Sequence, residues 1–333
     1  MEKGSLLGRK IVTLGGGTGH FALLTGLKTY PFAITAIPTS FDSGGNTGEH
    51  RDQFGALPAG DARRCLAALS NDETLRALLG FRFDGGLKGS PLEGQSLGNL
   101  MIMAADAMWG RGRGINRIEN ILKLAGSVFP VSTDDSHLVA LLSDGTILDN
   151  EKAIDTRDPF DLRHIVKVSL HPEAFVTREA ANAIVEADAI VFAPGDLYTS
   201  TIATLITGGC AEAIAASHGK LICVSNIMTK PAETRGYNLA KFINTFFEYG
   251  VGREKFDAVI VNSYAPQNGV AAKYREDEAT PILLDDESIK ALAGKVTTFV
   301  SRDLVSRAGL KENLIRHDPA TLAHAIVEFV SGK

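Results

Sequence analysis

The chain has 333 residues, 44% of them hydrophobic, and a formal net charge of −5 at pH 7. This length and composition allow a large buried core, in one big domain or in a main domain with a smaller appendage. Because acidic and basic residues are interspersed, we expect no basic face that would bind nucleic acid or an anionic membrane. No apolar run reaches the roughly 18 residues of a membrane helix, and the polar start is too short for a signal peptide. We therefore expect a soluble protein of the cytoplasm.

The cysteines and histidines show no spacing typical of a metal site. Cys65, Cys210 and Cys223 lie apart in apolar or mixed segments, without a C-x-x-C pair. The eight histidines form neither H-x-x-H nor H-E-x-x-H. The sequence thus predicts three buried free thiols and no zinc site.

The first element is a glycine-rich turn between a strand and a helix. Residues 11–14 are an apolar, β-branched run, residues 15–19 are Gly-Gly-Gly-Thr-Gly, and residues 21–28 have helical spacing. Glycines let a backbone approach an anion closely, and a helix start offers unpaired N–H groups, so this loop can hold phosphate. The alternative is a tight turn that needs glycine only for steric reasons. Both the G-x-G-x-x-G and Walker motifs require glycine where His20 stands, which disfavours an ordinary NAD enzyme or ATPase.

A strand at 33–38 completes a βαβ unit, and a long polar segment follows at 39–61. Long loops in compact domains are often functional. The next part of the chain has helical spacing, which predicts a helical middle section with helices at 61–69, 73–79, 96–108 and 115–124.

A small antiparallel insertion is expected at approximately 126–170. Its indications are two short β-like segments at 127–132 and 138–142, an Asp144-Gly145 turn, and a returning segment at 146–148.

Helices and strands alternate in the last half of the chain. Continuous apolar runs, typical of buried parallel strands, lie at 189–192, 221–224 and 258–261. Helices are predicted at 177–186, 202–216 and 239–249, and a final helix begins at Pro319 with Asp318 as its N-cap. The whole pattern predicts one large α/β domain over 1–333, with a Rossmann-like three-layer parallel sheet, a helical middle section and the small antiparallel insertion.

Four polar loops follow predicted strands, and ligands of such sheets bind at the carboxyl ends of the strands. The loops cover residues 15–19, 41–48, 193–200 and 225–229. Each is weak by itself, and their recurrence at one structural position favours a ligand site. The second loop also fits a solvated turn, and Thr199 and Ser200 fit either a helix cap or an anion site.

Two helix starts add candidates. Asp61 suits a helix cap or a functional carboxylate, and Arg64 suits pairing with a phosphate or with an acid beside a ribose. Asn99 lies one turn into an apolar helix, where its amide needs partners from loop backbone or from a ligand.

The motifs together resemble the gluconeogenesis factor (YvcK-type) branch of the CofD-like family over about residues 10 to 330. The order and spacing of the motifs carry this resemblance. They are Gly15-Gly16-Gly17-Thr18-Gly19, Asp42-x-Gly44-Gly45-x-x-Gly48, Leu57-Pro58-x-Gly60-Asp61-x-Arg63-x-Cys65, Gly98-Asn99-Leu100, Pro194-Gly195-x-Leu197-Tyr198-Thr199-Ser200 and Asn226-Ile227-Met228-Thr229.

The resemblance implies a Rossmann-like fold and one of two functions. The YvcK-type branch is a regulator of carbon metabolism and of cell-wall synthesis and cell shape that binds UDP-N-acetylglucosamine. The CofD branch is a magnesium-dependent 2-phospho-L-lactate transferase, which moves a phospholactyl group from a guanylyl-activated donor onto a deazaflavin. The second loop and the segment around Asp61 resemble the regulator more closely. The family also implies a homodimer.

Two departures from the family bear on magnesium. The family usually carries an Asp-Asp pair where this chain has Asp42-Ser43, and the loss of one carboxylate weakens a Mg²⁺ site. Asp196 stands where the family commonly has Ser; it either repels a diphosphate or replaces the lost carboxylate as a metal ligand. No cofactor follows from the residues themselves, and Mg²⁺ at Asp42 and Asp196 is an expectation from the resemblance.

The predicted ligand is a nucleotide diphosphate or nucleotide sugar bound across the strand ends, and the expected site residues fall into three groups. The nucleotide- or phosphate-binding group is Gly15, Gly16, Gly17, Thr18, Gly19, Gly44, Gly45, Arg64, Gly195, Tyr198, Thr199 and Ser200. The sugar- or base-binding group is Asp42, Ser43, Asn99, Asn226 and Thr229. The carboxylates to test for catalysis, if the chain is a transferase, are Asp42, Asp61 and Asp196.

Overall fold

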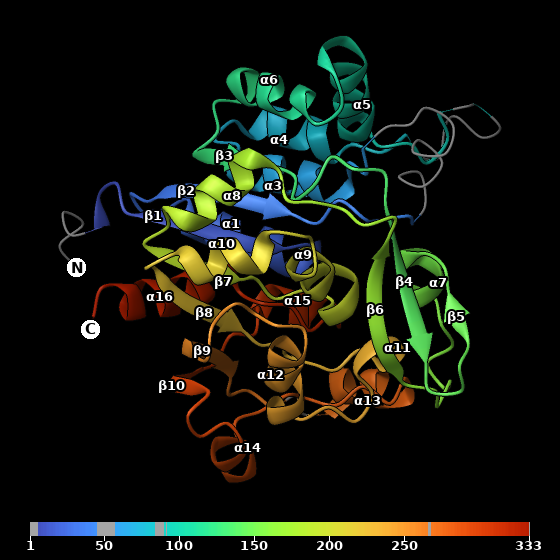
Figure 1. The fold of residues 1–333 in the computed structure, drawn as a ribbon, viewed down its shortest axis with the longest axis vertical. Coiled ribbons are helices and arrows are strands. Elements are labelled where there is room, and N and C mark those ends of the chain that lie inside the picture. The colour runs from blue at the N-terminus through green and yellow to red at the C-terminus, as the bar shows by residue number, and fades with distance from the viewer. Residues whose placement is uncertain (1–5, 45–56, 84–89, 91, 266–267, 333) are drawn as a thin grey trace.

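Seven parallel strands form the central sheet of the computed structural model, in the order β10-β9-β8-β7-β1-β2-β3 (Figure 1). The structure describes residues 6–44, 57–83, 90, 92–265 and 268–332. The strands are β1 (Lys10–Gly15), β2 (Ala33–Pro38), β3 (Gly126–Val128), β7 (Ala189–Phe192), β8 (Lys220–Val224), β9 (Phe256–Asn262) and β10 (Val296–Arg302). The predicted strands at 33–38, 189–192, 221–224 and 258–261 are confirmed.

The strand order reverses between β1 and β7. From β1 the chain continues outward through β2 to β3, whereas from β7 it continues through β8 and β9 to β10 on the other side. Such a switch point opens a crevice at the carboxyl ends of the two strands, since the loops that leave them turn apart. The loops after β1 and β7 are the first and third polar loops that the sequence analysis singled out.

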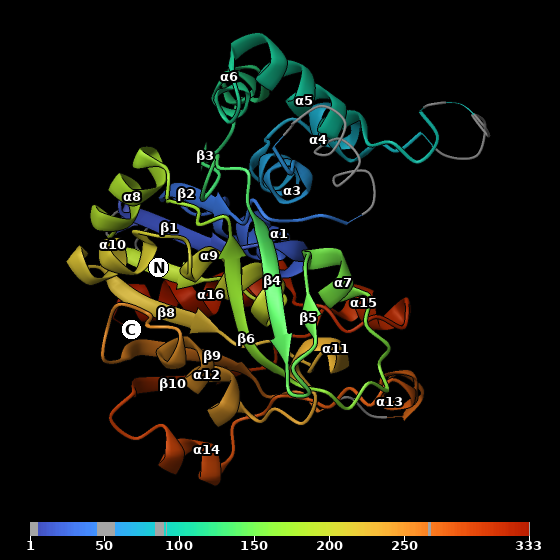
Figure 2. The same ribbon diagram turned by 45° about the vertical axis from the view of Figure 1, so that its right-hand side comes forward.

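Helices cover both faces of the sheet, as Figures 1 and 2 show. On one face α1 (Gly17–Leu27) packs against α3 (Gly60–Leu69) and α16 (Pro319–Val330), with Leu23 and Leu322 in their shared core. On the other face lie α8 (Arg178–Val185), α10 (Cys210–Ala216) and α12 (Leu239–Glu248), whose core includes Ile184 and Phe246. This arrangement is the predicted three-layer α/β fold.

The helical middle section lies between β2 and β3 in the chain and forms the upper part of the molecule in Figure 2. Besides α3, it contains α4 (Glu73–Gly80), α5 (Leu97–Trp109) and α6 (Arg113–Leu122). The predicted helices agree with these bounds within about two residues.

A separate three-stranded antiparallel sheet has the order β5-β4-β6. Its strands are β4 (His137–Leu142), β5 (Ile147–Leu148) and β6 (Ile165–His171), and α7 (Glu151–Asp155) lies between β5 and β6 in the chain. The segment predicted at 127–132 was wrongly placed in this sheet, because β3 pairs in parallel with β2 at the edge of the large sheet. Gly126 permits that pairing, since a Cβ there would meet the Ile34 carbonyl oxygen at 2.5 Å.

The helix predicted at 202–216 is interrupted. A π-helical segment, η2 (Leu197–Ile202), continues into α9 (Ala203–Leu205), and α10 begins only after Gly209, which has a φ of +88°. Further short helices are α11 (Pro231–Thr234), α13 (Asn268–Glu276), α14 (Asp286–Ala291) and α15 (Arg307–Lys311). The final helix is confirmed with its cap, because the Asp318 carboxylate accepts the Thr321 N–H at 2.9 Å.

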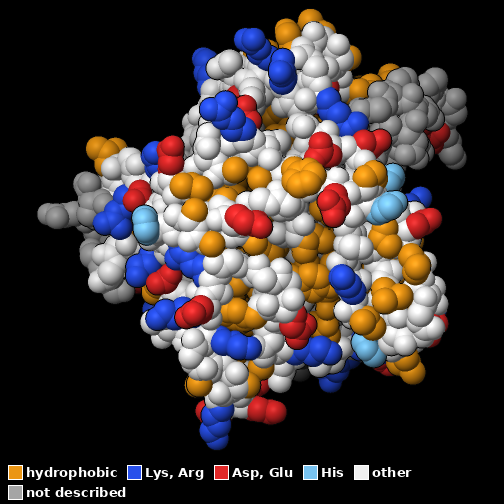
Figure 3. Space-filling model, viewed as in Figure 1, with side chains coloured by type: hydrophobic (Ala, Val, Ile, Leu, Met, Phe, Trp, Pro, Cys, Tyr) orange, Lys and Arg blue, Asp and Glu red, His pale blue; other side chains and the backbone are white. Residues whose placement is uncertain are grey.

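All three cysteines are buried and free, as predicted. Acidic and basic side chains are interspersed over the sheet and its helices on the face drawn in Figure 3. None of the helices in the described residues is long and apolar enough to cross a bilayer.

Candidate functional site

Two neighbouring cavities lie at the carboxyl ends of the central strands. Cavity A has a volume of about 410 Å³ and lies between the loops after β1 and β2, α3 and α7. Cavity B has a volume of about 320 Å³ and lies between the loops after β7 and β8 and the segment around His317. Thr18 and Asp196 line both cavities, so the two spaces meet at the start of α1.

The glycine loop begins α1 earlier than predicted, since Gly17 rather than Phe21 is its first residue. Gly17 has a φ of +72°, a conformation that favours glycine, and its N–H donates to the Asp61 carboxylate at 2.9 Å. The guanidinium of Arg64 donates to the same carboxylate oxygen at 2.6 Å. The chain's own carboxylate therefore binds one N–H of this helix start.

Gly16 and Gly19 of the motif have no room for a side chain, because other parts of the chain lie close to them. A Cβ on Gly16 would meet an Asp61 carboxylate oxygen at 2.2 Å, and one on Gly19 would meet the Pro194 carbonyl oxygen at 2.2 Å. These contacts support the interpretation of the loop as a tight turn that needs glycine for steric reasons, and phosphate binding by the loop stays possible beside it. Gly17, Thr18 and Gly19 line the cavities, whereas Gly15 and Gly16 do not.

Two neighbouring carboxyl groups, those of Asp42 and Glu151, line cavity A. Burial, followed by the charge of the neighbouring Asp42, raises the pKa of Glu151 to about 8. Burial and the charge of Asp61 also raise the pKa of Asp42. At neutral pH Glu151 therefore keeps its proton beside the Asp42 carboxylate. Ser43 does not line either cavity; its hydroxyl accepts the Lys152 N–H at 2.9 Å and thereby docks α7.

Three arginines, Arg63, Arg64 and Arg82, line cavity A. Arg63 donates to the side-chain oxygen of Asn99 at 2.9 Å, which supplies the polar partner that a buried Asn99 requires. The hydroxyl of Thr39, which lines the same cavity and is only 3% exposed, has no hydrogen-bond partner among the described residues.

A buried carboxylate from α11, that of Glu233, binds the start of η2 at the end of the third loop. Glu233 accepts the N–H groups of Tyr198 at 2.8 Å and Thr199 at 3.4 Å, and it accepts the Thr199 hydroxyl at 2.9 Å. The anion at this helix start is again a side chain of the protein. Thr199 and Ser200 line cavity A, but the Tyr198 hydroxyl lies in the core, 2.8 Å from that of Tyr237. The side chain of Tyr198 is thus directed away from the predicted phosphate site.

Cavity B combines amide, hydroxyl and apolar side chains. Asn226, Thr229, Ile227 and Met228 come from the loop after β8. His317, 9% exposed, also lines it, and its Nε2 has no hydrogen-bond partner within the described part of the chain. Burial lowers the pKa of His317 to about 4, so the imidazole is neutral.

Most of the predicted residues meet at these cavities. Those at cavity A are Gly17, Thr18, Asp42, Gly44, Asp61, Arg64, Asn99, Asp196, Thr199 and Ser200, and those at cavity B are Thr18, Gly19, Gly195, Asp196, Asn226 and Thr229. Gly15, Gly16, Ser43 and Tyr198 line neither. Gly45 lies outside the described residues.

Polar residues that the sequence did not indicate also line these cavities, among them Thr39, Arg82, Glu151, Asp155, Lys230 and His317. Asp155, Asp196 and Glu233 form a group of three metal-capable side chains, and this group does not include Asp42. Asp42 and Asp196, the predicted Mg²⁺ ligands, both line cavity A, so a Mg²⁺ ion held by these two carboxylates stays a prediction.

Comparisons with known proteins show that the chain belongs to the CofD family. A family model described as 2-phospho-L-lactate transferase CofD matches residues 11–302. The putative gluconeogenesis factor of Thermoanaerobacterium thermosulfurigenes is 37% identical over 325 residues, which cover 97% of each chain. The gluconeogenesis factor of Bacillus subtilis is 34% identical over 324 residues, covering 96% of this chain and 98% of the relative. A crystal structure of a UPF0052 family protein from Bacillus halodurans has a TM-score of 0.86 at 34% identity, covering 96% of this chain and all of that one.

Proposed function

Because the chain belongs to the CofD family and is similar to gluconeogenesis factors over nearly its whole length, we propose that it is a nucleotide-sugar-binding regulator. Its proposed ligand is UDP-N-acetylglucosamine or a similar nucleotide sugar. Its proposed role is in the control of central carbon metabolism, cell-wall synthesis and cell shape.

The observation that carries this proposal is the position of Thr18, in the first turn of α1, between the two cavities. A helix start favours an anion, through its N–H groups and its dipole. A ligand with a central diphosphate and two unlike ends suits such a junction. Ile227 and Met228 of cavity B give apolar contact for a base, and the charged and amide side chains of cavity A suit the hydroxyls of a sugar.

A Mg²⁺-dependent transferase of the CofD type is the second candidate. In its favour, Asp42, Asp61 and Asp196 all line cavity A, and the matching family model is named for that enzyme. Phosphoryl-group chemistry needs charge neutralisation and positioning rather than a protein nucleophile. Two of the carboxylates already have cationic partners, since Asp61 pairs with Arg64 and Asp196 with Lys230, which supports the regulator more than the enzyme.

The test is a thermal-shift measurement with UDP-N-acetylglucosamine, UDP-glucose, GDP and NAD, each with and without Mg²⁺. A ligand at 100 times its Kd adds about 2.7 kcal/mol to the free energy of unfolding. Stabilisation by UDP sugars alone supports the regulator. Mg²⁺-dependent stabilisation by GDP favours the transferase, and no stabilisation by any of the four contradicts the nucleotide-sugar proposal.

Gly17→Asp locates the binding site, and Gly250→Asp is a matched control. Both glycines have similar positive φ values, +72° and +69°, and a Cβ on either meets nothing within 4 Å. The two substitutions should therefore strain the backbone equally, by about 1–2 kcal/mol. Only Gly17→Asp adds a carboxylate at the cavities, so it alone should abolish nucleotide binding. Equal nucleotide affinities of the two variants would show that the glycine loop is not part of the binding site.

A further inference from the structure

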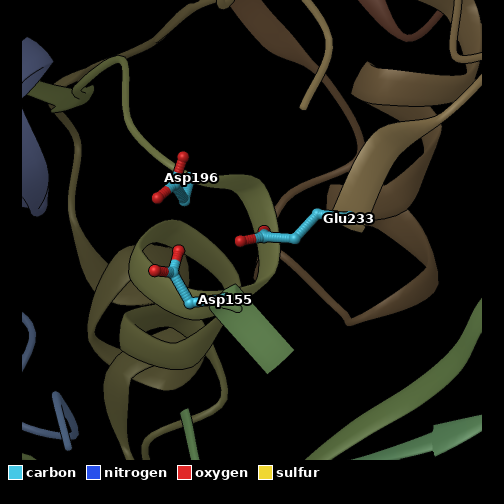
Figure 4. Close-up of side chains that lie close together, drawn as sticks. All are labelled: Asp155, Asp196 and Glu233. Carbon is cyan, nitrogen blue, oxygen red and sulfur yellow. The ribbon is translucent and has the colours of Figure 1, made fainter. Parts of the chain in front are cut away.

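Three carboxylates from separate segments surround a single lysine at the boundary of the two cavities. Asp155 ends α7, Asp196 follows β7, and Glu233 lies in α11. One oxygen from each of the three carboxylates lies within 4.8 Å of the other two, and Figure 4 shows the side chains gathered around one space. Asp155 lines cavity A, Lys230 lines cavity B, and Asp196 lines both.

The Lys230 ammonium fills that space. Its Nζ donates to Asp196 at 2.8 Å, to Glu233 at 3.3 Å and to Asp155. A lysine ammonium has three N–H donors and no acceptor, so each carboxylate can take one donor. The three carboxylates around the ammonium therefore offset the cost of burying its charge.

The same three oxygens have a spacing that suits a divalent ion. Two oxygens that each lie about 2.4 Å from one Ca²⁺ ion are at most about 4.8 Å apart, so the spacing is within the range of that ion. The smaller Mg²⁺ and Mn²⁺, which also prefer carboxylate ligands, require the oxygens to move slightly closer together. Glu233 has no exposed side-chain surface, and its orientation is fixed by the Tyr198 and Thr199 donors independently of Lys230. Part of the ligand set is thus held in place by contacts other than the lysine.

We propose that Lys230 is a built-in cation, which occupies the position of a divalent ion among Asp155, Asp196 and Glu233. These three carboxylates then bind no metal ion in the natural chain, and loss of the ammonium uncovers a divalent-cation site. The charge that Asp196 adds beside the glycine loop is balanced by Lys230, so this aspartate serves to hold the lysine. Lys230 is a positioning residue, since it joins α7 to the loop after β7 and to α11.

The experiment titrates MnCl₂ alone into the full chain at pH 7.5, by calorimetry and by thermal shift. Lys230→Met should bind one Mn²⁺ per chain with a Kd on the order of 10⁻⁴ M, at least about tenfold tighter than the natural protein. The ion should also raise the melting temperature of this variant. Lys230→Arg, which keeps a cation, should gain no site, nor should Lys255→Met, which removes an exposed lysine from the turn before β9.

Asp196→Asn added to Lys230→Met should abolish the gained Mn²⁺ binding, because it removes one of the three ligands. If Lys230→Met does not fold without metal, Lys230→Gln provides a second variant, and Mn²⁺ should restore the folded state of either. The proposal is overturned if folded Lys230→Met binds no Mn²⁺ or if Mn²⁺ fails to restore an unfolded variant. It is equally overturned if the natural protein binds Mn²⁺ at a site that Asp196→Asn removes. These readouts involve no nucleotide, so they are independent of the outcome for UDP sugars.

Discussion

The side-chain amide of Asn226 makes two hydrogen bonds with the backbone of Gly195. Its oxygen accepts the Gly195 N–H at 3.2 Å, and its nitrogen donates to the Gly195 carbonyl at 2.8 Å. Asn226 follows β8 and Gly195 follows β7, so this pair ties two neighbouring loops together at cavity B. This pair of hydrogen bonds needs a donor and an acceptor side by side, which an amide offers and an ionised carboxylate does not.

Asn226→Asp should therefore disrupt the site more than its small change in size suggests. A carboxylate at this position accepts the Gly195 N–H but repels the Gly195 carbonyl oxygen. We expect the free energy of unfolding to fall by about 1–3 kcal/mol, and nucleotide-sugar affinity to fall with it, since Gly195 lines cavity B. Urea unfolding and thermal shift measure the two effects. Asn182→Asp, a change at an exposed position of α8, should alter neither quantity. An unchanged free energy of unfolding for Asn226→Asp would contradict the stabilising role of the two Asn226–Gly195 hydrogen bonds.

Thr39→Val separates ligand binding from stability. Valine keeps the shape of the side chain and removes only the hydroxyl, which has no partner within the described residues. We expect an unchanged free energy of unfolding and about a tenfold loss of ligand affinity, the value of one hydrogen bond of about 1.4 kcal/mol.

Thr13→Val is the matched control for that substitution. Thr13 is also buried, but its hydroxyl lies 2.7 Å from Nε2 of His20. Its removal should lower the free energy of unfolding by about 1–2 kcal/mol, because the Nε2 atom of the buried imidazole loses this hydrogen-bond partner. A destabilised Thr39→Val would show that the Thr39 hydroxyl is used inside the protein instead.

Tyr198→Phe should affect stability and leave ligand binding unchanged. The two hydroxyls of Tyr198 and Tyr237 are buried and bonded to each other, so loss of one leaves the other unpaired, at a cost of about 1–2 kcal/mol. Tyr237→Phe should cost a similar amount, and the double variant should cost less than the sum of the two. Denaturant unfolding of the four proteins completes this cycle. If Tyr198→Phe binds UDP sugars more weakly than Tyr237→Phe does, Tyr198 contacts the phosphates as the sequence predicted.

The central strands were predictable because their burial on both faces leaves a continuous apolar run, as in β7 and β8. Edge strands carry no such run. β10 is half exposed and contains Thr297, Thr298 and Ser301, so its sequence does not distinguish it from a loop. β3 is three residues long and is a strand only because β2 lies beside it.

The site was predictable where the residues adjoin glycine turns at strand ends, as with Gly17 and Asn226. It was not predictable where function depends on tertiary pairing. Asp155 lies 75 residues from Lys230 in the sequence and comes from the antiparallel insertion. Nothing local indicates that Glu233 would bind the start of η2, 34 and 35 residues earlier in the chain.

The Asp42–Glu151 pair makes stability depend on pH. The pKa of Glu151 rises from its ordinary 4.5 to about 8 in the folded protein. Between these values the unfolded chain releases a proton that the folded protein keeps, so stability falls as the pH rises. Glu119, with a pKa raised to about 7 by burial, acts in the same direction. His20, whose pKa burial lowers to about 4, acts in the opposite direction up to its ordinary 6.5.

The contribution of Glu151 to the pH dependence of stability is therefore seen best between pH 6.5 and 8. The variant that measures this contribution is Glu151→Gln. Glutamine is neutral at every pH and can still donate a hydrogen bond to Asp42. Across this interval the free energy of unfolding of the natural protein should fall relative to that of Glu151→Gln. A difference of one bound proton gives at most about 1.4 kcal/mol per pH unit, and we expect only a fraction of it because the Glu151 side chain is only partly buried. Urea unfolding at several pH values measures the difference, with the exposed Glu254→Gln expected to follow the natural protein. Parallel curves for the natural protein and Glu151→Gln would mean that Glu151 is already ionised at pH 6.5.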